Sequence, residues 1–176
     1  MWADKAIERF PREPELLAAK AVALGRIGDL QGALAFSDAS IEERGDTPYV
    51  WLARGDVMLA RKERRADYCF EKALLLAPRN WFIAWLAARI RSYYNEFVLA
   101  LKLLQQAVEW NAGHFLLWLE LGRCQQALGL VRLAEHSLTQ AQQLNPHCQE
   151  ACLALIQLSH SGVWTRLRGW CRGKFR

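Results

Sequence analysis

The chain has 176 residues, 52% of them hydrophobic, and a formal net charge of +5 at pH 7. This length suits about one domain with a sizeable core, and the low content of proline and glycine excludes a collagen-like or disordered chain. The longest apolar run, from Trp81 to Ala88, excludes a membrane-spanning helix, which needs roughly 20 residues, and the first residues do not resemble a secretory signal.

Charge is distributed unevenly along the chain. Residues 1–162 carry 18 basic and 18 acidic side chains, and the whole excess lies after Gly162. We therefore do not expect residues 1–162 to bind nucleic acid or another polyanion through bulk charge. The five cysteines are an odd number in a chain that needs no disulfides to build its core, which favours a reducing compartment and predicts the cytoplasm.

A repeat of 33 or 34 residues runs through the chain. Alanine recurs at Ala33, Ala66, Ala100 and Ala134. Fixed offsets of +4, +7 and +12 residues from these alanines give three further sets: Ser37, Phe70, Leu104, Leu138; Ser40, Ala73, Ala107, Ala141; and Gly45, Pro78, Ala112, Pro146. Another small residue precedes each alanine by eleven or twelve positions: Ala21, Gly55, Ala88 and Gly122.

This spacing predicts helical hairpins. Two helices approach closely where both carry small residues, and large side chains such as Phe70 and Trp118 fill the space beside the contact. Each hairpin leaves an apolar face that the next hairpin covers, so several must stack.

In chain order, we predict one repeat domain over 1–162 and a separate tail. The domain begins with a half unit, 1–13, in which Ala3, Ala6 and Pro11 fit the second helix of a hairpin. Four units follow at 14–47, 48–80, 81–114 and 115–148, and a capping helix covers 149–162. The tail comprises 163–176.

Turn signals agree with these units. Gly28, Asn95 and Gly129 fall between the two helices of a unit, where a left-handed residue is favoured. Thr47 and Pro48 are typical of an N-cap and the first helical position. The second unit departs from the pattern, because it is one residue shorter and has Arg61-Lys62-Glu63 at its turn.

The segment Trp118-Leu119-Glu120-Leu121-Gly122, followed by Ala134, Leu138, Ala141 and Pro146, resembles the tetratricopeptide repeat (TPR) family. The resemblance covers about residues 3–160, with four repeats in register. It implies an all-α, right-handed α-solenoid of stacked antiparallel helix hairpins. It also implies a scaffold for protein–protein interactions that is not an enzyme and holds a partner peptide or helix in a concave groove.

In this family the first helix of each hairpin lines the groove. The matching positions are Glu15, Val22, Arg26; Tyr49, Leu52, Asp56; Phe82, Trp85, Arg89, Tyr93; and Leu116, Leu119, Glu120, Arg123. Of these we predict that Phe82, Arg89, Tyr93 and Arg123 form the recognition centre, because aromatic and arginine residues dominate interface energetics. Trp85 fits the groove and the core equally well, since the neighbouring core position holds Ala84.

Some members of the family clamp a C-terminal carboxylate with lysine and asparagine. The matching positions here are Ala18, Val22, Leu52 and Asp56, which disfavours that partner class. We expect an apolar segment or amphipathic helix as partner, and neither a small molecule nor a cofactor.

The tail interleaves basic and aromatic residues, and Trp164, Leu167, Cys171 and Phe175 would share one helical face. It suits a polar cap over the end of the stack, or contact with an anionic membrane through Trp164, Arg166, Arg168, Trp170, Arg172 and Lys174. Two alternative functions follow: a membrane-associated assembly factor anchored by the tail, and an RNA-binding helical repeat.

Motifs of catalysis are not found: there is no glycine-rich phosphate loop, nucleophile elbow or HExxH. His147, Cys148 and Cys152 have a spacing that zinc can use, but Cys152 falls on a position of the repeat expected to be buried, so no metal is predicted. Cys69 and Cys124 are also expected in the core.

Overall fold

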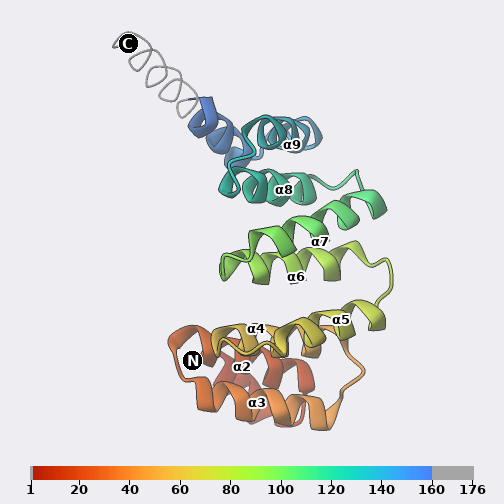
Figure 1. Ribbon diagram of the computed structural model, residues 1–176. Coiled ribbons are helices and arrows are strands. Elements are labelled where there is room, and N and C mark those ends of the chain that lie inside the picture. Colours follow the sequence, from red (N-terminus) through yellow and green to blue (C-terminus); the bar gives the residue numbers. More distant parts are fainter. Residues whose placement is uncertain (1, 160–176) are drawn as a thin grey trace. The chain divides into compact units, whose positions relative to one another are not determined.

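The computed structural model describes residues 2–159, and these are helical with short turns and contain no strand (Figure 1). The helices are α1 (Trp2–Arg9), α2 (Pro14–Ile27), α3 (Leu30–Glu43), α4 (Pro48–Ala60), α5 (Ala66–Leu76), α6 (Trp81–Tyr93), α7 (Phe97–Trp110), α8 (Phe115–Ala127) and α9 (Val131–Leu144). Residues 149–159 form one more helix. Within the described range, none of the helices combines the length and apolar character needed to cross a bilayer.

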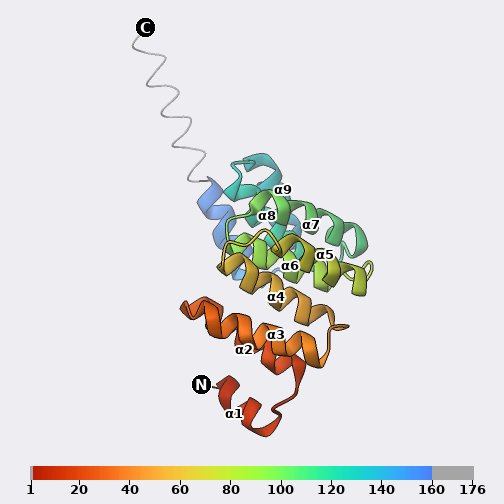
Figure 2. The same cartoon turned by 60° about the horizontal axis from the view of Figure 1, so that its bottom comes forward.

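Two compact units divide the chain, Met1–Glu96 and Phe97–Arg176. In the first unit, α2 pairs with α3 and α4 pairs with α5. Helix α4 also packs on α2 and α3, α6 packs on α4 and α5, and α1 lies against α2 (Figure 2). The predicted unit 81–114 contributes α6 to the first compact unit and α7 to the second.

The second compact unit contains α7, the hairpin of α8 and α9, and the helix 149–159. Helix α7 packs on α8. Leu119 of α8, Leu138 of α9 and Ala151 of the last helix belong to one buried apolar cluster, which joins these three elements. The predicted all-α arrangement of neighbouring helix pairs is confirmed. Residues 160–162 of the predicted cap and the whole tail, 163–176, lie outside the described residues.

The small residues of the repeat lie where helices approach closely. Ala33, Ala66, Ala100 and Ala134 are all at most 2% exposed. A Cβ atom on Gly55 would lie 2.8 Å from the ring of Phe70, and one on Gly122 would lie 2.6 Å from Leu138. These two glycines therefore make room for the large side chain of the facing helix, as the spacing predicts.

Left-handed residues occupy the turns of the hairpins. Gly28, Asn95 and Gly129 have φ values of 95°, 64° and 74°, which confirms the prediction. The irregular second turn uses Lys62, with φ of 58°, at the same place. Thr47 is the N-cap of α4 and Pro48 its first residue, but the threonine side chain forms no capping hydrogen bond.

Two tryptophans connect consecutive hairpins in the same way. The indole nitrogen of Trp51 donates a 2.6 Å hydrogen bond to the carbonyl of Gly45, and that of Trp118 donates one of 2.7 Å to the carbonyl of Ala112. Each bond joins a first helix to the loop that precedes it, six residues earlier. At the matching position of α6, Ala84 offers no such donor.

Three cysteines of the described residues fall on positions that the repeat predicts to be buried, and two of them are buried. Cys69 and Cys124 are each 2% exposed, as predicted. Cys152 was expected to be buried, and this prediction is wrong, because its side chain is exposed whereas Cys148 is buried. At the matching position of α8, Trp118 packs on His136 of the paired helix α9. The last helix, 149–159, ends at the limit of the described residues, so no second helix of its own pair is described beside Cys152.

Candidate functional site

Side chains from α2, α4 and the end of α6 meet in a polar cluster of the first compact unit. We call it the Asp56 cluster; it consists of Arg26, Asp56, Tyr93 and Tyr94. Nη2 of Arg26 lies 2.6 Å from Oδ2 of Asp56, and the hydroxyl of Tyr94 donates a 2.6 Å hydrogen bond to Oδ1. Both carboxylate oxygens are thereby engaged, which a buried charge requires.

Burial and neighbouring charge shift the pKa values of two members of the cluster, Tyr94 and Arg26. The Asp56 side chain is only 4% exposed. Burial and the hydrogen bond to Asp56 raise the pKa of Tyr94 well above its ordinary value, so its hydroxyl remains a donor. Burial alone would lower the pKa of Arg26, but the hydrogen bond to Asp56 and the charge of that carboxylate outweigh it and raise the pKa.

Aromatic rings hold the arginine of the cluster. The guanidinium carbon of Arg26 lies 3.4 Å from the ring centroid of Tyr93 and 5.4 Å from that of Tyr94, which is a cation–π arrangement. Tyr93 is 58% exposed, and the Arg26 side chain is 28% exposed. The cluster therefore presents a fixed cation and an aromatic ring to solvent.

A shallow pocket of about 360 Å³ adjoins the cluster. It is lined by Gly25, Arg26, Ile27, Gly28, Leu30, Ala60, Tyr93 and Tyr94. Its wall comes from the turn between α2 and α3 together with the ends of α4 and α6. The pocket offers an apolar surface beside the fixed cation.

Helix α6 carries a row of aromatic side chains. Phe82 stacks on Trp85 at 5.6 Å and meets Trp81 edge-on at 5.8 Å. The guanidinium of Arg89 lies 4.9 Å from the ring centroid of Trp85. Phe82 remains 46% exposed, whereas Trp85 is 8% exposed and its indole nitrogen has no hydrogen-bond partner among the described residues. Phe82 is thus the accessible member of the row.

Tyr49 of α4 is 37% exposed. Burial of its hydroxyl, followed by the charges of Asp56 and Glu15, raises the pKa of Tyr49. Tyr49 therefore belongs to the electrostatic surroundings of the Asp56 cluster. Together, Tyr49, Phe82 and Tyr93 are the exposed aromatic residues on the first helices of this unit.

Several residues assigned to the groove by resemblance are core residues. Leu52 and Leu119 are each 1% exposed, so they support the first helices from within. In the second compact unit, Leu116 is partly buried, and Arg123 bonds to Glu120 at 3.4 Å and Glu150 at 3.0 Å. Because Arg123 lies in the second unit, its convergence with Phe82, Arg89 and Tyr93 stays a prediction.

Sequence reasoning missed Tyr94 and the pairing of Arg26 with Asp56. The repeat assigned both charged residues to the groove lining, and they have opposite charges on consecutive first helices. Their places in the repeat are offset by about one helical turn, which side chains of this length can span. Tyr94 follows the last residue of α6, where the repeat carries no signal.

In the described part of the chain, no group of three or more histidine, cysteine, aspartate or glutamate side chains is placed so that it could hold a metal ion.

No protein-family model matches the chain, and no curated protein sequence matches it.

Solved structures do resemble this chain. It is 23% identical to YrrB, a TPR protein with an unusual peptide-binding site, over 91% of this chain and 83% of that one, with a TM-score of 0.57. The first TPR of Spaghetti (RPAP3), bound to the HSP90 peptide SRMEEVD, is 20% identical over 66% and 94% of the two chains, with a TM-score of 0.57. Human IFIT1, as a dimer with m7Gppp-AAAA, is 18% identical; 91% of this chain matches 41% of that one, with a TM-score of 0.65.

At these identities the likenesses establish the fold and leave the ligand open. They agree with the paired helices, the buried small residues and the left-handed turns described above. The chain therefore has the tetratricopeptide-repeat fold.

Proposed function

We propose that this protein is an interaction module that binds a peptide or helical segment of a partner protein on the first helices α2, α4 and α6. The TPR structures similar to this chain, one with a peptide-binding site and one bound to a peptide, support a protein-interaction scaffold. The observation that carries the proposal is the exposure of Phe82 and Tyr93 on α6, at 46% and 58%. Exposed aromatic side chains beside a fixed arginine are typical of interaction hot spots.

The chemistry of this surface favours an apolar or amphipathic partner segment. Arg26 is already paired with Asp56, so the surface offers little free charge. At the positions where some relatives hold a carboxylate with lysine and asparagine, Ala18 and Leu52 are each 1% exposed. The HSP90 peptide bound by the RPAP3 repeat is therefore not the partner class we propose for this chain.

Peptide display on the full chain would test this proposal. Peptides selected for binding would be measured by fluorescence anisotropy against Phe82→Ala and Tyr93→Ala variants. We expect each variant to bind about tenfold or more weakly, because a hot-spot truncation costs more than about 1.4 kcal/mol.

Tyr68→Ala is the matched control, since Tyr68 lies on the second helix α5 and is 59% exposed. Its affinity should match the wild type, and thermal melting would verify that every variant is folded. Loss of binding in Tyr68→Ala, with unchanged binding in Phe82→Ala and Tyr93→Ala, would move the interaction to the other face.

The two alternative functions remain predictions. The hypothesis of a membrane-associated assembly factor depends on residues 163–176, which lie outside the described range. Liposome flotation of the chain with and without these residues would test it. The hypothesis of an RNA-binding helical repeat predicts that the chain is retained on RNA in a salt-dependent way. Residence in the cytoplasm also stays a prediction.

A further inference from the structure

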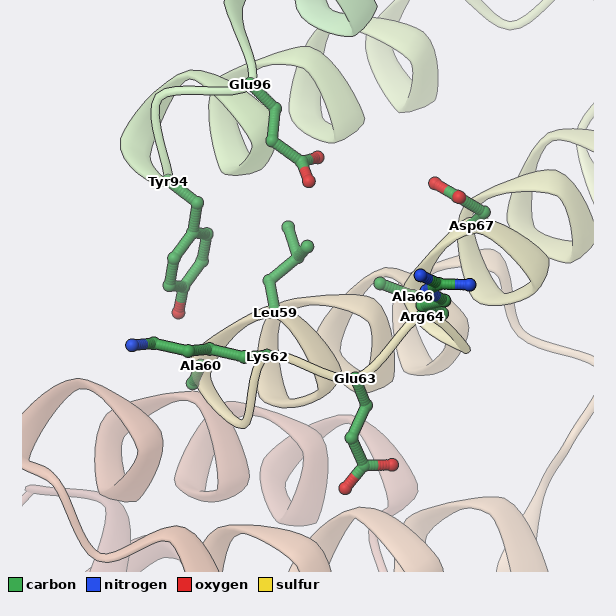
Figure 3. A pocket seen from close by; sticks show the side chains of 9 residues that line it. All are labelled: Leu59, Ala60, Lys62, Glu63, Arg64, Ala66, Asp67, Tyr94 and Glu96. Atoms are coloured by element: carbon green, nitrogen blue, oxygen red, sulfur yellow. The ribbon is translucent and has the colours of Figure 1, made fainter.

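A second, larger pocket lies in the first compact unit, where the turn between α4 and α5 faces the end of α6 (Figure 3). We call it the turn pocket. Its volume is about 510 Å³, and it is lined by Leu59, Ala60, Lys62, Glu63, Arg64, Ala66, Asp67, Tyr94 and Glu96. The Asp56 cluster adjoins it, since Tyr94 lines both pockets.

Arg91 of α6 pairs with two of the acidic residues that line the turn pocket, Asp67 and Glu96. It is 6% exposed, and its guanidinium lies 4.4 Å from the ring centroid of Phe70. It binds Asp67 at 2.7 Å and Glu96 at 2.6 Å. Met58 holds the matching place in α4, four residues before the left-handed turn. At this place Arg91 of α6 pairs with Asp67 of α5, where α4 carries an apolar side chain.

The acidic residues of the turn pocket are all paired with arginine. Glu63 binds Arg61 at 2.5 Å, and Asp67 and Glu96 share Arg91. By contrast, Lys62 and Arg64 are exposed and form no ion pair with any residue that the structure describes.

The lining of the turn pocket carries two basic residues, Lys62 and Arg64, and three acidic ones, Glu63, Asp67 and Glu96. The arginines that pair with these acids, Arg61 and Arg91, add two positive charges, so four positive charges face three negative ones. Lys62 and Arg64 are therefore the charges left for a ligand carboxylate, whose attraction is strongest at low ionic strength.

The middle of the pocket is apolar. In Figure 3 the side chain of Leu59 points toward Glu96 and has Tyr94 to one side, while Lys62 runs past its base toward Tyr94 and Glu63 points away. Leu59 and Tyr94 are partly buried. An apolar side chain placed here would cover Leu59 and the ring of Tyr94, with Lys62 to one side and Arg64 to the other (Figure 3).

We propose that the turn pocket binds an acidic peptide segment that carries one large apolar side chain. The apolar side chain would pack on Leu59 and Tyr94, and flanking carboxylates would pair with Lys62 and Arg64. This inference rests on the proposed function, because it describes a second contact of the same kind of partner. It also gives a role to the irregular turn Arg61-Lys62-Glu63, which the repeat leaves unexplained.

A labelled ten-residue peptide of glutamates with a central leucine would test this, using anisotropy with the full chain. We expect binding that weakens as salt is added. A central glycine, or lysines in place of the glutamates, should abolish it. The double variant Lys62→Glu, Arg64→Glu should bind on the order of tenfold more weakly or worse, and the neutral pair Lys62→Gln, Arg64→Gln should show a smaller loss in the same direction.

Lys102→Glu, Arg132→Glu is the control with the same net charge, since both residues are exposed on helices of the second compact unit. Its affinity should equal that of the wild type. Equal loss in both double variants, absence of binding, or equal binding of the glycine peptide would overturn the proposal. Tighter binding of a single-stranded oligonucleotide than of the peptide would assign the pocket to nucleic acid instead.

The outcome separates this inference from the proposed function. If the binding of display-selected peptides depends on Phe82 and Tyr93, but not on Lys62 and Arg64, the proposed binding surface on α2, α4 and α6 is supported and the turn-pocket proposal is contradicted. Binding that depends on Lys62 and Arg64, but not on Phe82 and Tyr93, would support the turn-pocket proposal and contradict the proposed binding surface on the first helices.

Discussion

The phenol of Tyr94 donates a 2.6 Å hydrogen bond to Oδ1 of Asp56, which precedes it by 38 residues. The bond fixes the end of α6 to α4. Tyr94→Phe removes the donor and leaves a buried carboxylate with one partner fewer, so we expect the free energy of unfolding to fall by about 1.5–3 kcal/mol. Urea titration followed by circular dichroism would measure it. Tyr68→Phe should change nothing, because the Tyr68 hydroxyl forms no hydrogen bond with a described residue.

The same bond predicts a loss of stability at high pH. The pKa of Tyr94 is raised above its ordinary value of 10.0, first by burial and then by the hydrogen bond to Asp56. A group whose pKa is raised by folding stabilises the protein fully below its unfolded value, and this stabilisation is lost as pH rises above about 10. Thermal melting between pH 8 and 11 should show a steeper fall for the wild type than for Tyr94→Phe. Parallel curves would exclude Tyr94 as the group responsible.

The indole hydrogen bonds predict equal roles for two tryptophans in different repeats. Trp51→Phe and Trp118→Phe each remove a donor to a loop carbonyl, at Gly45 and Ala112, and should each lower the free energy of unfolding by about 1 kcal/mol. Trp110→Phe serves as control, because Trp110 is 37% exposed and forms no hydrogen bond through its indole within the described range. A loss in only one of the two repeats would show that the bonds are not equivalent.

Two glycines within helices should respond oppositely to alanine. A Cβ on Gly25 meets Ala33 and Ala60 at 3.8 Å, an ordinary contact, so Gly25→Ala should stabilise the protein by roughly 0.5–1 kcal/mol through helix propensity. On Gly122 the Cβ would lie 2.6 Å from Leu138, and overpacking of about 1–3 kcal/mol should exceed that gain. Chemical denaturation of both variants checks the sign of each change; stabilisation by Gly122→Ala would contradict the close approach.

The repeat could be found in the amino-acid sequence because it reflects local requirements that recur in every hairpin. Small residues such as Ala134 and Gly122 are needed wherever two helix backbones meet, and left-handed residues such as Gly129 are needed wherever the chain reverses. Both depend on positions within one hairpin, so their spacing along the chain predicted them. Lys62 is the left-handed residue of the turn between α4 and α5, but a lysine does not predict this conformation from the amino-acid sequence.

Side-chain partnerships between hairpins could not be found in that way. The bonds of Asp56 to Arg26 and Tyr94, and that of Arg91 to Asp67, depend on how far each helix is rotated and shifted against the next. Spacing along the chain does not specify that rotation. Packing of the whole set of neighbouring side chains specifies it, which is why the polar cluster and the turn pocket emerged from the assembled helices.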